Sequence, residues 1–377
     1  MDSKILARTA TNSLFFVCGI DFATWAARIP DVKEKLHLSD AALGTVLLFA
    51  PIGSIVALPI AGMIIDKFGS RKITTFSTLI YLFSMPFIGF SSTVIQLMAA
   101  LFCFGFGGDL LNIAMNVQAV GVEKIYQKTI MSSFHGVFSI GFMIGFALGG
   151  VIAHSGVSMG IHLTTLGILT FIVGLLSFNF LLKSDEKSEQ TQPLFALPDK
   201  SLWILALICL CGMMGEGAVA DWSALYFKNL PDNHISFVTA ASTAFSVMMV
   251  LGRFVGDWIA DKVGIKNMIL VNCILFGLGM VAAVGIASPV SVIIGFGITG
   301  LGLSTIVPLC YSEAGHSKTM SSGVALAAIT TVGMLGFLLG PVVIGYLSEL
   351  TTLRMALSLL ILLALISSVL TRFIREE

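Results

Sequence analysis

Residues 62–72 read GMIIDKFGSRK and lie between two long apolar segments. Gly69, near the end of this stretch, allows the backbone to reverse direction tightly. The cytoplasmic side of a membrane is favoured for the turn because it carries three bases, Lys67, Arg71 and Lys72. The same arrangement returns 195 positions later, where residues 261–266 read DKVGIK. Two copies of one turn, one in each half of the chain, predict a duplicated membrane protein.

The composition supports a membrane protein. Of the 377 residues, 56% are hydrophobic and 11% are charged, and the mean hydropathy is +0.97. Apolar runs of about 20 residues follow one another, which is the length that a helix needs to cross the hydrocarbon layer. Because lipid offers the backbone no hydrogen-bond partners, spanning segments of this kind are helices. The 38 glycines are typical of closely packed membrane helices.

We predict an all-α integral membrane protein with twelve transmembrane helices. The predicted spans are 8–29, 40–65, 73–91, 94–120, 131–153, 160–182, 201–227, 236–260, 267–287, 289–312, 320–347 and 354–372. Residues 1–182 form an N-terminal six-helix bundle and residues 201–377 a C-terminal one. Residues 183–200, a polar stretch, are the predicted cytoplasmic linker.

The two halves match beyond the turn, which indicates two parallel six-helix repeats. The offsets drift from 189 to 197 in three pairs: Trp25 with Trp222, residues 131–133 with 320–322, and residues 145–149 with 336–340. Insertions in loops produce such a drift. Parallel repeats predict a binding site near the middle of the bilayer that is exposed alternately to either side.

The loop charges predict the orientation. With both termini in the cytoplasm, fifteen Lys and Arg residues lie on the cytoplasmic side and five on the other. Basic residues concentrate on the cytoplasmic side of membrane proteins. We therefore expect a multi-pass protein of the bacterial inner (plasma) membrane with both termini inside.

Several classes of function find no support in the sequence. The formal net charge is zero and there is no basic tract, which argues against a nucleic-acid partner. All six cysteines lie in apolar segments without a nearby histidine, so they are interpreted as packing residues, with no disulfide and no metal site. There is no phosphate-binding glycine loop, no H-E-x-x-H motif and no convincing triad. We expect no cofactor and no enzymatic activity.

Residues 62–72 resemble the G-x-x-x-D-[RK]-x-G-x-[RK]-[RK] turn of the major facilitator superfamily at every specified position, whereas the second copy has Asp257 in place of the first glycine. Three stretches resemble the MosC/YbjJ-like branch: residues 25–30 (WAARIP), 131–139 (MSSFHGVFS) and 216–223 (EGAVADWS). The resemblance implies the major facilitator fold and a secondary transporter, for sugar-like or inositol-like solutes.

Polar residues inside the spans are the candidates for function, because a charged residue costs about 2.5–3.5 kcal/mol at a helix centre on insertion scales. On the first helix, three of them share a face at i, i+4 and i+7, and on the fourth helix three share a face at i, i+3 and i+7. Others lie on the seventh helix and at the cytoplasmic end of the fifth. The predicted substrate-binding and proton-coupling residues are Asp21, Trp25, Arg28, Asp109, Asn112, Asn116, His135, Glu216, Asp221 and Trp222.

These residues predict a polar central cavity in which Asp21, Asp109 and Glu216 carry protons or bind solute. Trp25 and Trp222 would offer flat faces to a sugar ring or a cation. The alternative is a structural role, for example a pair of Asp21 with Arg28. Sugar–proton symporters of the superfamily place a carboxylate shortly before an Asn on the fourth helix. Here Asn112 takes that place and Asp109 lies one turn earlier.

A second set of charges is expected to gate the inward-closed state: Asp66, Arg71, Glu123, Arg253, Asp257 and Asp261. The alternative is that they serve topology and local pairing only, as for Arg253 and Asp257 at i and i+4. Glycines at 212, 215 and 217 predict a break in the seventh helix. Residues 141–150 resemble a motif of drug–proton antiporters, with Phe146 in place of a proline, and their small residues allow another helix to approach closely.

The function expected from the sequence is proton-coupled transport of a small polar solute (a sugar, polyol or amine derivative) by alternating access. The alternatives are a proton-coupled exporter of amphipathic compounds, a non-transporting membrane sensor with a carrier fold, and a membrane-embedded enzyme. The expected partners are the solute, protons and membrane lipid, and we expect the chain to act as a monomer.

Overall fold

The computed structural model describes residues 3–127, 130–183, 197–231, 237–315, 317, 320 and 322–374, without the side chains at 62, 66, 132, 257, 261, 315, 322 and 323. Within these ranges the protein is helical and has no β-strand. Ten segments are long and apolar enough to cross a membrane, and Ala240–Gly256 adds a shorter apolar helix. The chain divides into two compact units, Met1–His37 with Val46–Gln190, and Leu38–Thr45 with Thr191–Glu377.

The helices of the first unit are α1 (Ser3–Ala27), α2 (Ile29–Lys35), α4 (Phe49–Phe68), α5 (Ser70–Phe90), α6 (Val94–Tyr126), α7 (Met131–His154) and α8 (Met159–Phe178). Those of the second unit are α9 (Trp203–Lys228), α10 (Ala240–Val263), α11 (Ile265–Met280) with its π-helical end η1 (Val281–Ile286), α12 (Pro289–Leu303), α13 (Ile306–Gly315), α14 (Ser322–Leu350) and α15 (Leu353–Leu370), followed by the short 3-10 helix η2 (Thr371–Phe373). Helix α3 (Asp40–Leu47) begins in the second unit. Each predicted span coincides with one helix or with two consecutive helices.

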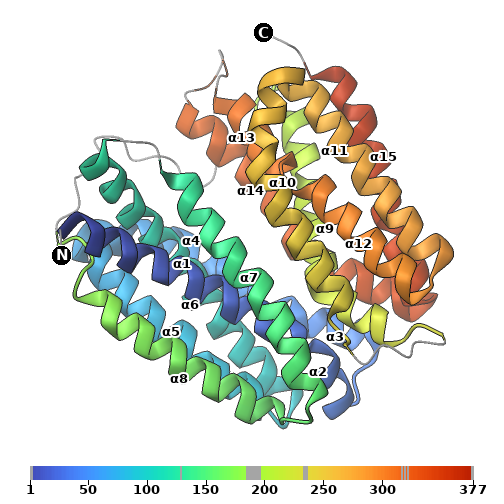
Figure 1. Ribbon diagram of the computed structural model, residues 1–377, viewed down its shortest axis with the longest axis horizontal. Coiled ribbons are helices and arrows are strands. Elements are labelled where there is room, and N and C mark those ends of the chain that lie inside the picture. Colours follow the sequence, from blue (N-terminus) through green and yellow to red (C-terminus); the bar gives the residue numbers. More distant parts are fainter. Residues whose placement is uncertain are drawn as a thin grey trace. The chain divides into compact units, whose positions relative to one another are not determined.

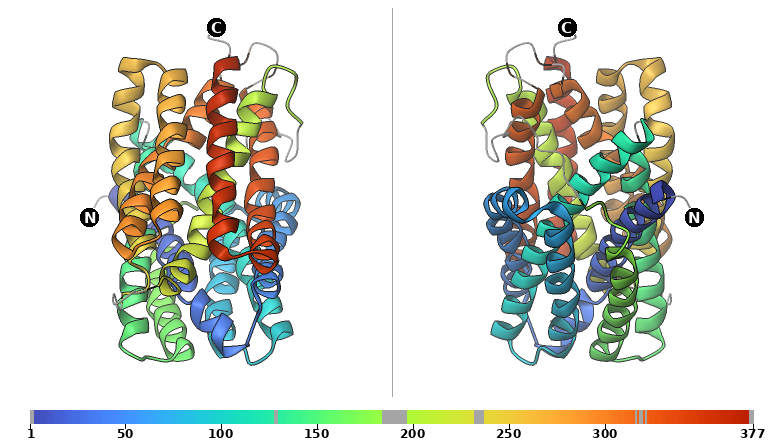
Figure 2. Two further views of the ribbon diagram at one scale, coloured as in Figure 1. Left: turned by 90° about the vertical axis from the view of Figure 1, so that its right-hand side faces the viewer. Right: turned by 90° about the vertical axis from the view of Figure 1, so that its left-hand side faces the viewer.

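The same helix pairs recur in both units. In the first unit α1 packs along α7, α4 and α5 pack on α6, and α8 packs on α5 and α1 (Figure 1). In the second unit α9 packs along α14, α10 and α11 pack on α12, and α15 packs on α11 and α9; the last of these is visible in the left view of Figure 2. Since corresponding helices have corresponding partners, the predicted pair of parallel six-helix repeats is confirmed.

The two copies of the turn have the same backbone. Gly69 has φ 85° and ψ 149°, and Gly264 has φ 85° and ψ 148°. Each donates its N–H back into the preceding helix, to Ile65 O and to Ala260 O, both at 2.8 Å. A positive φ disfavours residues with a Cβ. The reversal predicted from these glycines is confirmed at both places.

Glycines also bring α7 and α14 against their partners. Gly141 and Gly145 of α7 lie on the backbone of α1 at Phe16 and Ile20. In the second unit Gly336 of α14 lies on the backbone of α9 in the same way. The close approach predicted for the small residues at 141–150 is therefore confirmed, and packing is sufficient to explain them.

The predicted break in the seventh helix is wrong. Helix α9 runs without interruption over Trp203–Lys228. Its glycines fit neighbouring rings, with Gly215 against Phe276 and Gly217 against Phe337. Interruptions occur elsewhere, at residue 48 between α3 and α4 and at residues 304–305 between α12 and α13. A helix tolerates glycines when neighbouring side chains fill the space that they leave.

Residues 38–45 pack with the second unit although they precede α4 of the first. Ser348 of α14 donates a hydrogen bond to Asp40, and the N–H of Ala41 donates to Glu349 Oε2 at 3.3 Å. Residues 184–196 of the predicted linker lie outside the described residues, so the boundary at 183–200 stays a prediction.

Candidate functional site

Asp21 is a fully buried acid on α1. Neither of its carboxyl oxygens has a hydrogen-bond partner within the described part of the chain. The side chain of Thr170 on α8 lies beside it. However, the hydroxyl of Thr170 donates to Leu166 O at 2.9 Å, and a hydroxyl has only one hydrogen to give. Asp21 thus has one polar neighbour, Thr170, whose hydroxyl hydrogen is directed to the backbone of its own helix.

The surroundings of Asp21 follow from how α1 is packed. This helix is covered by α6, α7 and α8, so residues on several of its faces become buried. One turn before Asp21, Cys18 O accepts a hydrogen bond from the hydroxyl of Tyr81 at 3.1 Å. Asp21 and Asp109 are both near enough to Cys18 to interact with it electrostatically. The first unit therefore contains two acids around one small polar region.

The predicted polar face of α6 is partly joined by hydrogen bonds. The amide of Asn116 donates to Asn112 O at 2.8 Å and to Asn112 Oδ1 at 3.0 Å. Asn112 is exposed and Asn116 is half-buried. Asp109 lies beside Asn112, and its Oδ2 is buried without a hydrogen-bond partner among the described residues. Along this face the side chains run from the exposed amide of Asn112 to the half-buried acid Asp109.

In the second unit Glu216 of α9 faces Arg253 of α10. Arg253 Nη2 and Glu216 Oε1 are 3.5 Å apart, and the two side chains are 31% and 24% exposed. Arg253 Nε also donates to Ser304 O at 3.4 Å, where the helix is interrupted between α12 and α13. This charged pair bridges two helices and reaches the interruption in a third. The sequence predicted Glu216 as a site residue but did not predict Arg253 as its partner.

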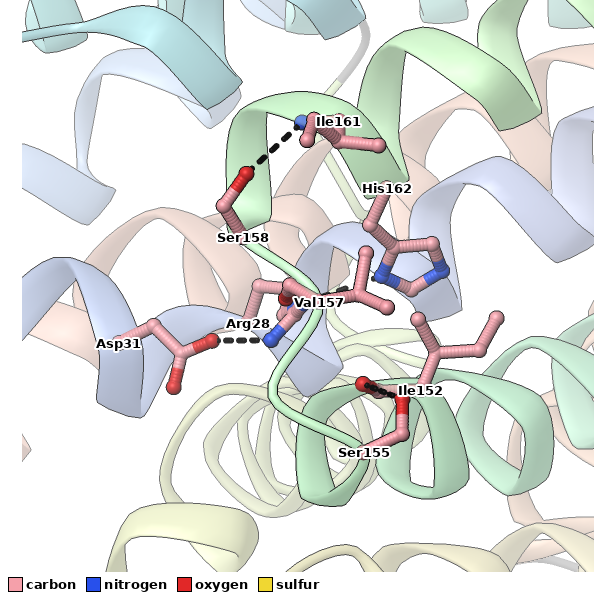
Figure 3. A network of polar contacts seen from close by, with 8 residues as sticks. All are labelled: Arg28, Asp31, Ile152, Ser155, Val157, Ser158, Ile161 and His162. Atoms are coloured by element: carbon pink, nitrogen blue, oxygen red, sulfur yellow. Dashed lines mark hydrogen bonds and ion pairs between the residues drawn. The ribbon is translucent and has the colours of Figure 1, made fainter.

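Arg28, on the predicted polar face of α1, has a different partner from the one that the sequence suggested. Arg28 is buried and pairs with Asp31, Nη1 to Oδ2 at 2.5 Å, so the alternative pair with Asp21 is not formed (Figure 3). Trp25 and Trp222 are buried, and the indole N–H of Trp222 has no partner among the residues described. Their contact with a solute stays a prediction.

The two remaining site candidates are His135 on α7 and Asp221 on α9. His135 is exposed near the start of α7, with the ring of Phe15 at 5.3 Å from its own. Asp221 of α9 directly precedes Trp222 and is half-buried. Their roles stay predictions.

Of the predicted gating residues, Glu123 has the clearest contacts. Its Oε1 accepts hydrogen bonds from the N–H groups of Ile130 (2.6 Å) and Met131 (2.7 Å), at the start of α7. Arg71 donates from Nε to Phe178 O at 3.1 Å. The side chains of Asp66, Asp257 and Asp261 lie outside the described residues.

Replacing Glu123 tests its role at the start of α7. We expect Glu123→Ala to lower the free energy of unfolding by about 1 kcal/mol, since it leaves two helix-terminal N–H groups without their acceptor. Glu123→Gln keeps an oxygen acceptor and should cost less. Unfolding in mixed detergent micelles measures both variants, and equal losses would contradict the capping role.

Two residues that lie beside predicted site residues were not predicted from the sequence. Thr170 beside Asp21 and His162 beside Arg28 are both on α8. His162 is the only ionisable residue of α8, which is a signal that sequence reasoning could have used. Thr170 gave no such signal, because a hydroxyl in a membrane helix usually bonds to its own backbone.

A family model for the Major Facilitator Superfamily matches residues 11–324 of this chain. The chain belongs to the Major Facilitator Superfamily. It is 32% identical over 363 residues to an uncharacterized MFS-type transporter of Yersinia pestis, covering 96% of this chain and 94% of the relative. It is 31% identical to the membrane protein MosC of Rhizobium meliloti, covering 96% and 89%. The predicted resemblance to the MosC-like branch is confirmed.

Solved structures support the same fold. The crystal structure of the nucleoside transporter NupG aligns with a TM-score of 0.82 over 100% of both chains, at 13% identity. At this identity the likeness concerns the fold alone. As a superfamily member, the chain is a multi-pass membrane transporter that binds small molecules, and proteins of this superfamily are generally not enzymes.

Proposed function

We propose that this chain is a proton-coupled secondary transporter of a small polar solute such as a sugar, polyol or amine derivative. We further propose that it works as a monomer in the bacterial inner membrane, with both termini in the cytoplasm as the loop charges favour. The observation that carries proton coupling is Asp21, a fully buried acid whose two oxygens have no partner among the described residues.

Charge is costly at the buried position of Asp21 inside the first unit. An ionised carboxylate without donors in an apolar interior is costly, whereas a protonated carboxyl group can donate its hydrogen to the Thr170 oxygen. The arrangement therefore fits a protonated Asp21. Ionising this group would require donors or water that another conformation must bring. A proton on Asp21 then favours one conformation over the other, which is the requirement for coupling.

The solute class is proposed from the accessible polar side chains. Asn112 and Asn116 offer amide donors and acceptors, and Glu216 with Arg253 offers both charges. Such groups suit hydroxyl or amine substituents and would be left unsatisfied by a purely apolar compound. We propose solute contacts within each unit, at Asn112 and Asn116 in the first and at Glu216 in the second, and inward-closed gating by Asp66, Arg71, Glu123, Arg253, Asp257 and Asp261.

The test is in two steps on purified protein. Thermal-shift screening of sugars, polyols, amines and amphipathic drugs at two pH values identifies a ligand. Uptake of that ligand into proteoliposomes is then measured with an imposed pH gradient, inside alkaline, with and without a protonophore. We expect accumulation that the protonophore abolishes. Accumulation that survives the protonophore would overturn proton coupling, and ligands found only among the amphipathic drugs would overturn the polar solute.

A further inference from the structure

Arg28 at the end of α1 holds three separate parts of the first unit together (Figure 3). Its Nη1 donates to Asp31 on α2, its Nη2 donates to Val157 O between α7 and α8 at 2.5 Å, and its Nε donates to His162 Nδ1 on α8 at 3.0 Å. Arg28 is 2% exposed and His162 is 6% exposed. The guanidinium group is thus buried, charged and bonded in three directions.

The bond to His162 fixes the state of the imidazole. A guanidinium group is always protonated and can only donate, so Nδ1 of His162 must accept with its lone pair. The ring is therefore neutral, with its hydrogen on Nε2. A proton on Nδ1 would place two donors face to face and a second positive charge against Arg28, in a buried position with Asp31 as the acid of the network.

We propose that His162 is a proton-binding site that controls the attachment of α2 through Arg28. When His162 is neutral, Arg28 bridges α2 to α8. When His162 binds a proton, this bridge is lost and α2 loosens. The proposal goes beyond the transport function, because it concerns a different histidine and a different end of α1 from Asp21.

The attachment of α2 matters for the segment Leu38–Thr45, which follows α2 in the chain. At its other end α2 is held by Lys35, whose Nζ donates to Gly89 O of α5 at 3.3 Å. Three residues later the segment Leu38–Thr45 begins, which packs with the second unit. Helix α2 is therefore the piece of the first unit directly before the segment that leaves it. Loosening α2 changes how that segment is anchored.

Helices α1 and α5 pack against α8, and α2 and the chain after α7 adjoin the Arg28 network, so their ionisable groups must be considered as sources of pH dependence. They include Lys4, Arg8 and Asp21 of α1, Asp31, Lys33, Glu34 and Lys35 of α2, Arg71, Lys72 and Tyr81 of α5, and His154 of α7. Arg71 contacts Phe178 O at the opposite end of α8. Histidine is the side chain whose ordinary titration falls between about pH 5 and 8. That leaves three groups to separate: His162, His154, and His37 two residues after the end of α2.

Hydrogen–deuterium exchange of residues 29–35 tests the proposal without any solute. The purified protein is compared at about pH 7.5 and about pH 5.5, across the histidine range, with labelling times scaled for intrinsic exchange. In the wild type we expect protection of α2 to fall by about tenfold at the lower pH, the factor that one hydrogen bond to a charged group is worth. Unchanged protection in the wild type would overturn the proposal.

Two variants of His162 and two control variants decide whether His162 is responsible. His162→Asn places a carbonyl oxygen at the position of Nδ1 and cannot be protonated, so α2 should stay protected at both pH values. His162→Leu removes the acceptor and should give weak protection at both. The control variants His154→Asn, at the exposed end of α7, and His37→Asn, just after α2, should each behave as the wild type. A full pH response in His162→Asn, or its loss in either control variant, would refute the assignment.

Discussion

Asp21→Asn is expected to abolish proton-driven accumulation while the protein stays folded. A carrier that moves one proton with one solute converts a difference of one pH unit, about 1.4 kcal/mol, into a roughly tenfold concentration ratio. Asparagine resembles the protonated acid in shape but cannot release a proton. The accumulation ratio should therefore fall to about one, while exchange of labelled for unlabelled solute continues.

The same substitution makes a prediction about stability. The oxygens of Asp21 have no partner among the described residues, so asparagine should leave the unfolding midpoint unchanged or raise it. Residues kept for function at a cost in stability behave in this way. Cys18→Ala, one turn away on α1 and also buried, is the matched control and should retain accumulation. Uphill transport by Asp21→Asn would remove Asp21 from the coupling mechanism.

Gly336→Ala is expected to destabilise the second unit strongly. A Cβ at this position would lie 2.7 Å from the backbone nitrogen of Met214 and closer still to Leu210 O, and neither atom can move without displacing α9. Overpacking of this kind costs about 1–3 kcal/mol. Because α9 also carries Glu216, we expect a lower unfolding midpoint in mixed micelles together with reduced transport.

Gly340→Ala provides the comparison on the same helix. One turn along α14, a Cβ at Gly340 would lie 3.6 Å from Met214 O, an ordinary contact distance. Alanine should be neutral there, or stabilising by up to about 1 kcal/mol through its higher helix propensity. Equal effects of the two substitutions would show that close approach of α14 to α9 does not limit stability.

The pair of Arg253 with Glu216 in the second unit could not be predicted from sequence spacing. Spacing along one helix favoured a local pair of Arg253 with Asp257, because i and i+4 residues are neighbours on a helix surface. The structure brings Arg253 of α10 to Glu216 of α9 and to the interruption after α12. Spacing reveals neighbours within a helix, but partners on other helices depend on which faces pack together.

The sequence by itself determined the membrane class, the spans, the repeated turn and the superfamily. These follow from local properties: apolar length, loop charge and the backbone freedom of Gly69 and Gly264. It also marked Asp21 as costly, since an acid inside an apolar run is expensive wherever its neighbours lie.

Tertiary structure alone decided what surrounds each polar residue. It placed Thr170 beside Asp21, paired Arg28 with Asp31 and His162, and kept α9 uninterrupted over three glycines. The physical reason is that hydrogen bonds and steric contacts act over a few ångströms in space. In a bundle, the groups at that range come from helices far apart in the chain.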